Sequence, residues 1–312
     1  MYDRRFQFAS ALLYDPQSSM RYNTRIALLN IGFGEVEAVT SLEELEERLE
    51  AGNYDLIVGD SRSNGGDTTG LVKKIRQHSV GKNPFVNVIV TLWDTSIEQV
   101  QAIIDSGTDD LLMRPMSSTN LNDRVQSLVH ARKPFIVTGD YIGPERRQIV
   151  RGLSPVSHMV VPNSLQAKVE NRPELDATPE NVRAALQAVN DRKITIYTEH
   201  FLRSSSKIMS LTNDEADLKE RENIVRSLQV MNNDLVRRIE GTEFSHILSL
   251  CDALDDLLMK IGGSRAMLSE QEKELLLQIP FAIHKGCKEL RESADLAFDI
   301  QSVSRQLKTA HG

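Results

Sequence analysis

The sequence predicts an α/β domain with a doubly wound, five-stranded parallel sheet, followed by an all-α elongated bundle or coiled coil. Within residues 1–132, five short apolar runs alternate with five helical patterns. The runs lack polar alternation, which is typical of parallel strands covered on both faces. From about residue 177, glycine is scarce and apolar residues recur at spacings of three and four, as in packed helices.

The elements of the first domain are marked by the residues that begin and end them. The expected strands are residues 8–14, 35–39, 55–59, 86–91 and 110–113, and the expected helices are residues 18–31, 41–52, 69–77, 94–106 and 118–131. Gly32 ends the first helix, and Gly107 ends the fourth. Ser41 and Glu44 form a capping box that opens the second. Pro115 follows the last strand. Right-handed crossovers would then wind these helices onto both faces of the sheet.

Length, charge and hydropathy limit the class of protein. A chain of 312 residues is long enough for two domains, and a net charge of −7 gives no field that attracts nucleic acid. The first ten residues contain no apolar stretch typical of a signal peptide, and no segment approaches the roughly 18 apolar residues of a membrane span. The two cysteines, Cys251 and Cys287, lie in apolar helical patterns and are interpreted as buried thiols. We therefore expect a cytoplasmic protein without a nucleic-acid or membrane partner.

Four polar residues lie at the carboxyl ends of the expected strands: Asp15, Asp60, Thr91 and Arg114. In a parallel α/β sheet, ligands bind outside this edge. A single aspartate there is usually a helix cap, but four polar residues in this order exceed what the fold needs. A carboxylate, a hydroxyl and a cation together form a clamp for a phosphoryl group.

Three segments carry a resemblance to a known family. They are YDLIVGD at 54–60, VIVTLWD at 88–94 and SGTDDLLMRP at 106–115. Residues 1–132 resemble the response-regulator receiver family of bacterial two-component signalling, whose fold is flavodoxin-like. The resemblance implies that Asp60 is the phosphoacceptor and that Thr91 and Arg114 contact the phosphoryl group.

The same resemblance implies a metal ion and a partner. The ion is Mg²⁺, with Asp15, Asp60 and the backbone carbonyl of Arg62 as its ligands. The implied partner is a histidine kinase or a phosphotransfer protein.

The sequence departs from the family in three positions. The family usually has two adjacent acids after the first strand, but here Pro16 follows Asp15. Arg114 stands where the family has a lysine, and Leu111 stands at an aromatic switch position. The missing acid predicts weak Mg²⁺ binding, and the missing aromatic predicts an atypical receiver.

Residues 133–176 lose periodicity and contain five prolines, which predicts a linker or extended arm. Within it, FIVTGDYIGPERR (135–147) is either a docking element or a solvated tether. It resembles a segment that follows receiver domains in some alphaproteobacterial signalling proteins.

Residues 177–312 form the predicted helical domain. Apolar seams run through residues 224–235, 247–261 and 283–294. These seams must be buried inside one chain or across a homodimer, or against an unknown protein partner.

The sequence contains no motif of a catalytic effector domain, so the receiver would catalyse only its own phosphorylation and dephosphorylation. The first hypothesis is a response regulator that accepts a phosphoryl group at Asp60 and signals through its helical domain. The alternative is an adaptor with a receiver fold that binds partners constitutively, without phosphotransfer. Asp60, Thr91 and Arg114 favour the first hypothesis, and the lost acid pair favours the second.

Overall fold

The computed structural model describes residues 2–61, 67–93, 96–146 and 158–289. The chain divides into two compact units, Met1–Ala188 and Val189–Gly312, and the division falls inside the long helix α7 (Pro179–Ser210). The two units are described separately below.

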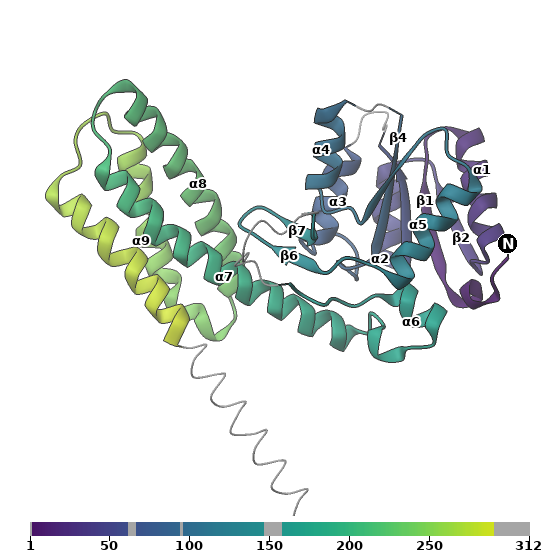
Figure 1. Ribbon diagram of the computed structural model, residues 1–312. Coiled ribbons are helices and arrows are strands. Elements are labelled where there is room, and N and C mark those ends of the chain that lie inside the picture. Colours follow the sequence, from purple (N-terminus) through teal and green to yellow (C-terminus); the bar gives the residue numbers. More distant parts are fainter. Residues whose placement is uncertain (1, 62–66, 94–95, 147–157, 290–312) are drawn as a thin grey trace, which may run out of the picture. The chain divides into compact units, whose positions relative to one another are not determined.

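The first unit is built on a parallel sheet with the strand order β2-β1-β3-β4-β5. Its strands are β1 (Ser10–Tyr14), β2 (Glu35–Val39), β3 (Leu56–Asp60), β4 (Asn87–Leu92) and β5 (Asp110–Met113). The helices between and after them are α1 (Ser18–Ile31), α2 (Leu42–Ala51), α3 (Thr68–Arg76), α4 (Ile97–Asp105) and α5 (Ser118–His130). The predicted fold class and the alternation of elements are confirmed (Figure 1).

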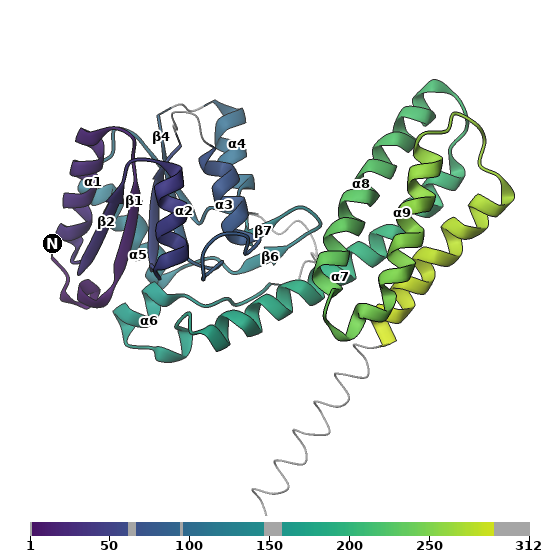
Figure 2. The same ribbon diagram turned by 180° about the vertical axis from the view of Figure 1, so that it is seen from behind.

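Alternating side chains of the strands belong to two separate apolar cores, one on each face of the sheet. Leu13 and Val58 pack with α1 and α5 on one face of the sheet. Leu12 and Ile57 pack with α2, α3 and α4 on the other face. Figures 1 and 2 show this layered arrangement from opposite sides. Because both faces are covered, the strands carry apolar residues in continuous runs.

The first strand begins two residues later than the sequence predicts. Residues Arg4–Phe8 form a short 3₁₀ helix, η1, in which the Asp3 side chain accepts a hydrogen bond from the Arg5 backbone N–H. Phe8 is 72% exposed, so it belongs to this turn and not to the buried strand. The expected start of the fourth helix, at residue 94, lies outside the described residues.

Residues 135–146 and 158–176 differ from the expected linker or arm because they pack on the receiver unit. They form the antiparallel strands β6 (Phe135–Val137) and β7 (Ile142–Pro144), the helix α6 (Ser164–Glu170) and the 3₁₀ helix η2 (Pro173–Leu175). Phe135 and Leu165 are fully buried, and Leu165 joins the core beneath α1 and α5. The first unit therefore extends well beyond the predicted boundary at residue 132. The FIVTGDYIGPER portion behaves as an element docked on its own chain.

The second unit is a helical bundle with its own core. Beyond α7 it contains α8 (Glu215–Ile239), the 3₁₀ helix η3 (Glu243–Ile247), α9 (Leu248–Gly262) and a helix over residues 270–289. Leu228 and Leu235 of the first predicted seam are fully buried, and so is Leu254 of the second. Of the arrangements that the sequence left open, the described parts of the seams are buried inside one chain. The third seam is described only to residue 289.

Candidate functional site

The four predicted site residues meet at the carboxyl edge of the sheet. Asp15 follows β1, Asp60 ends β3, Thr91 lies near the end of β4, and Arg114 follows β5. Asp60 and Thr91 are register partners on neighbouring strands. The side chains of Asp15, Asp60 and Arg114 are at most 2% exposed. The parallel topology therefore brings together residues that lie up to 99 positions apart in sequence.

Arg114 is the centre of this cluster. Its Nη2 donates to Asp15 Oδ2 at 2.7 Å, and its Nε lies 3.2 Å from Asp60 Oδ2. The same Nε donates to Thr91 Oγ1 at 3.0 Å, while the Thr91 hydroxyl lies 3.3 Å from Asp60 Oδ2. One guanidinium thus links two carboxylates and a hydroxyl.

Further hydrogen bonds hold Asp15 and Asp60 in place, one at the Asp15 carboxylate and two at the main-chain carbonyls of Asp15 and Asp60. Asp15 Oδ1 accepts the Gln17 backbone N–H at 2.8 Å, and the Arg21 side chain donates to the Asp15 carbonyl at 2.6 Å. The Thr68 hydroxyl, in the first turn of α3, donates to the Asp60 carbonyl at 2.9 Å. These bonds hold both aspartates at the sheet edge independently of their bonds to Arg114.

The negative charges of Asp15 and Asp60 act on Tyr14, the last residue of β1. Burial, reinforced by the negative charges of Asp60 and Asp15, raises the pKa of its phenol above the ordinary value. The phenol therefore stays neutral at physiological pH.

The described residues do not fit a conventional divalent-cation site. Mg²⁺ prefers several oxygen ligands in octahedral geometry. The part of the chain that the structure describes holds no group of three or more acids, histidines or cysteines arranged for a metal. Asp15 and Asp60 are already bonded to Arg114, and Arg62, whose carbonyl was the third expected ligand, lies outside the described residues. No catalytic step is therefore derived through a metal.

A groove of about 210 Å³ lies beside Arg114. It is lined in part by Met20 and Thr24 of α1 and by Pro115 and Leu121 before and within α5. Arg114 thus contributes to the lining of a recess next to the site.

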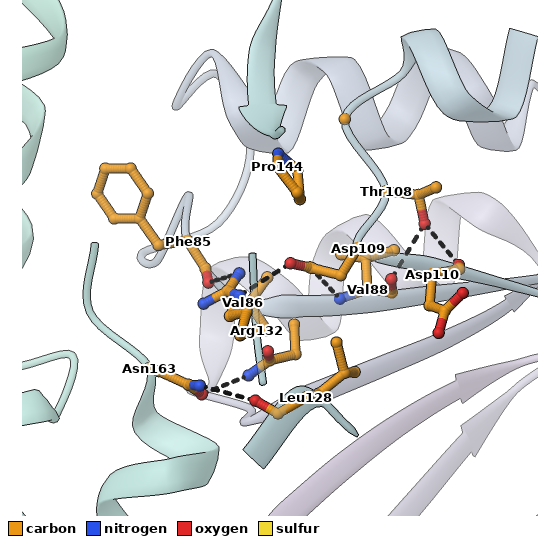
Figure 3. A network of polar contacts seen from close by, with 12 residues as sticks. Phe85, Val86, Val88, Thr108, Asp109, Asp110, Leu128, Arg132, Pro144 and Asn163 are labelled. Carbon is orange, nitrogen blue, oxygen red and sulfur yellow. Dashed lines mark hydrogen bonds and ion pairs between the residues drawn. The ribbon is translucent and has the colours of Figure 1, made fainter. Parts of the chain in front are cut away.

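A second polar cluster, which the sequence reasoning missed, lies at the amino ends of β4 and β5. Asp109 is 1% exposed at its side chain and accepts bonds from Arg76 at 2.8 Å and from Arg132 at 2.8 Å. It also accepts the Val88 backbone N–H at 2.8 Å (Figure 3). Arg76 lies in a helix and Arg132 just after one, so no local pattern links them to Asp109.

This amino-end cluster helps to fix the docked segment, residues 135–146 and 158–176, to the sheet. The Arg132 guanidinium donates to the carbonyls of Phe85 and Pro162. The Asn163 side chain donates to the Leu128 carbonyl at 2.9 Å (Figure 3). It also accepts a hydrogen bond from the Asn87 side chain at 2.9 Å. The signal that could have revealed this docking is the apolar run at 135–137, because such a run is rarely left in water.

The described helices include none with both the length and the apolar composition needed to cross a membrane.

Comparison with known proteins identifies the first part of the chain. The family model described as the response regulator receiver domain matches residues 11–126. The transcriptional regulatory protein BasR of Escherichia coli (strain K12) is 30% identical over 121 residues, which are 37% of this chain and 53% of BasR. The chain thus matches about half the length of this curated relative.

Solved structures include similar chains. The chemotaxis protein CheY4 of Vibrio cholerae has 24% identity and a TM-score of 0.35, over 38% of this chain and 97% of CheY4. A response regulator receiver protein from Pseudomonas putida has 21% identity and a TM-score of 0.35, over 38% of this chain and 96% of its own. From the family match and the parallel sheet, residues 11–126 are a response regulator receiver domain.

Proposed function

We propose that this chain is a response regulator that accepts a phosphoryl group on Asp60. The observation that carries the proposal is the contact of the Asp60 carboxylate with both Thr91 and Arg114 at the carboxyl edge of the sheet. Receiver domains act with a histidine kinase or a phosphotransfer protein, and they are generally signalling modules that lack other enzymatic activity. The donor here would be such a protein, in the cytoplasm.

The proposed reaction is an in-line transfer. A carboxylate oxygen of Asp60 forms a bond to phosphorus while the bond from phosphorus to the donor nitrogen breaks, and the donor keeps that electron pair. Arg114 and the Thr91 hydroxyl then turn from the carboxylate to the phosphoryl oxygens, whose charge they stabilise. Mg²⁺, which receiver domains generally bind at their acidic site, is proposed to bind only weakly here, at Asp15 and Asp60.

The test is phosphorylation of the full chain by acetyl phosphate, followed by intact-mass spectrometry. We expect one phosphoryl group in the unaltered protein and none in Asp60→Asn. The control is Asp67→Asn, since Asp67 is a nearby exposed acid that caps α3. Equal labelling of Asp60→Asn and the unaltered protein would refute the assignment.

A second candidate is the adaptor without phosphotransfer, which one observation favours. Asp60 is fully buried. One of its carboxylate oxygens, Oδ2, already contacts both Arg114 and Thr91. A phosphoryl donor must therefore displace a bonded guanidinium. Absence of labelling, both by acetyl phosphate and by a mixture of kinases, would select this candidate.

We also propose that the helical unit carries the output by binding a protein partner or a second copy of the chain. The described parts of its predicted seams are buried within the chain, so we place the contact on another surface. Leu277 and Phe281 are spaced by one helical turn and are 53% and 58% exposed. Light scattering of the full chain, with and without Leu277→Ser and Phe281→Ser, tests self-association. A dimer that persists in the double variant would exclude this surface as the contact between copies.

A further inference from the structure

We infer that Arg114 is the built-in counter-cation of Asp15 and Asp60, so that a divalent cation can bind this site only by displacing its guanidinium. The inference deepens the proposed function and rests on it for the role of the site. Its physical basis is separate, because it depends on how the two carboxylates are bonded and not on phosphotransfer.

The geometry of the Arg114 guanidinium suits two separated carboxylates. Its Nη2 bonds Asp15 at 2.7 Å, whereas its Nε faces Asp60 at 3.2 Å. These nitrogens are held apart in a planar, permanently charged fork. A lysine would offer one compact ammonium on a flexible stem, which makes it a poorer bridge between two separated carboxylates. Arginine therefore suits the bridging position that this site presents.

The ion pairs of this site are buried. The Arg114 side chain is 2% exposed and both carboxylates are fully buried, so water screens these ion pairs weakly. An arriving Mg²⁺ would lose part of its hydration shell and would face a positive guanidinium between its two ligands. Mg²⁺ gives up its water molecules reluctantly. The ion and the neighbouring guanidinium are both positive, and such charges repel strongly in a low dielectric.

The described residues of the site supply few ligands for a metal ion. Pro16 stands next to Asp15 and supplies no carboxylate. With two carboxylates and one internal cation, the site already holds part of the positive charge that a divalent ion would bring. The lost acid and the arginine thus act in the same direction, toward weak metal binding.

The chain contains a built-in reporter for this site. Trp93 is its only tryptophan, and the Arg114 guanidinium carbon lies 6.0 Å from the centre of the Trp93 ring. Movement of the guanidinium or arrival of an ion should change tryptophan fluorescence. The experiment is a MgCl₂ titration of the full chain without a phosphodonor, with NaCl of equal ionic strength as the control.

The decisive variant is Arg114→Gln, which removes the charge and keeps a hydrogen-bonding side chain. We expect its half-saturating Mg²⁺ concentration to be at least tenfold lower than that of the unaltered protein, with Arg114→Lys between the two. Adding Asp60→Asn to Arg114→Gln should abolish the response. If Arg114→Gln does not fold without metal, Arg114→Lys supplies the comparison, and its Mg²⁺-dependent rise in melting temperature should exceed that of the unaltered protein.

Equal Mg²⁺ affinity in the unaltered protein and in both Arg114 variants would overturn the inference. So would a saturable response of the unaltered protein that is as tight as that of Arg114→Gln. Because Mg²⁺ is the only probe, failure of Asp60 labelling would leave this result unaffected, and a failed titration would leave the labelling result intact.

Discussion

The two ends of the receiver sheet each carry a buried cluster of arginine and aspartate, but the clusters are built in opposite ways. At the amino end, two guanidiniums share the single carboxylate of Asp109. At the carboxyl end, the single guanidinium of Arg114 is shared by two carboxylates.

The bonds of the arginines also differ. Arg76 donates to the backbone carbonyls of Gly107, Pro84 and Val86 as well as to Asp109. The Arg114 guanidinium bonds side chains: Asp15, Asp60 and Thr91. Backbone acceptors cannot leave without unfolding the strand or loop that carries them, whereas side-chain acceptors can rotate. The amino-end cluster is therefore structural, whereas the carboxyl-end cluster can exchange partners.

Burial changes the charge equilibrium at the amino end. Burial, partly offset by the Asp109 carboxylate, lowers the pKa of Arg76 to about 10. Arg76 therefore remains charged at neutral pH, and its stabilisation depends on Asp109 and on the backbone carbonyls around it.

The largest expected effect comes from Asp109→Ala. It would leave Arg76 and Arg132 without their shared carboxylate in a buried place, at a cost of about 3–5 kcal/mol in unfolding free energy. The matched control is Asp110→Ala, because Asp110 pairs with Arg124, whose side chain is 51% exposed, and should cost less than about 1 kcal/mol. Urea unfolding followed by circular dichroism measures both. Equal losses of unfolding free energy in Asp109→Ala and Asp110→Ala would show that the buried amino-end cluster stabilises the fold no more than the exposed ion pair does.

A double-mutant cycle at the carboxyl end comes next. Asp15→Asn and Asp60→Asn alone should each change stability by no more than about 1 kcal/mol, because Arg114 keeps one carboxylate in either case. The double variant should lose about 3 kcal/mol, since it leaves Arg114 buried without a counter-charge. Additive single effects in urea unfolding would contradict the bridging role of Arg114.

A smaller effect is expected from Phe135→Leu. The Phe135 ring lies 5.2 Å from the Arg76 guanidinium carbon and 5.0 Å from that of Arg132. Losing both cation–π contacts should cost about 2 kcal/mol and should loosen the docked segment. The control Phe8→Leu alters an exposed ring. Hydrogen exchange of β6 and β7 reports the loosening, and unchanged protection of these strands would refute the anchoring role.

The smallest effect concerns alkaline pH. Burial and the two acids raise the folded-state pKa of Tyr14, so folding favours its neutral form. This stability is fully present below the unfolded pKa near 10 and is lost as pH rises through the folded pKa. Between pH 9 and 11, Tyr14→Phe should therefore lose stability less steeply than the unaltered protein. Parallel curves in urea unfolding would exclude a contribution from Tyr14.

The sequence predicted the receiver well because its signals are local. The elements were expected within three residues of their observed bounds. The signals were apolar runs without alternation, the cap at Ser41 and the helix end at Gly107. The four site residues were found because each lies at or next to the carboxyl end of a strand, and parallel strands share one carboxyl edge. The metal and phosphoacceptor roles of these residues stay predictions.

The sequence could not predict features that depend on contacts between distant residues. Nothing near Arg132 indicates that it bonds Asp109, and the five prolines of 133–176 suggested a linker although Phe135 and Leu165 are buried. The spacing of the 224–235 seam showed that an apolar face exists and could not show what covers it. Only the tertiary structure decided that it packs inside one chain.

By itself, then, the sequence determined the strand and helix order and the set of side chains at the sheet edge, because both follow from neighbours along the chain. The tertiary structure alone decided how those side chains are bonded. Asp15, Asp60 and Arg114 could have formed a metal site with a free cation beside it. Folding places both carboxylates against one rigid guanidinium away from water, where the ion pairs are weakly screened, and this makes Arg114 the centre of the site.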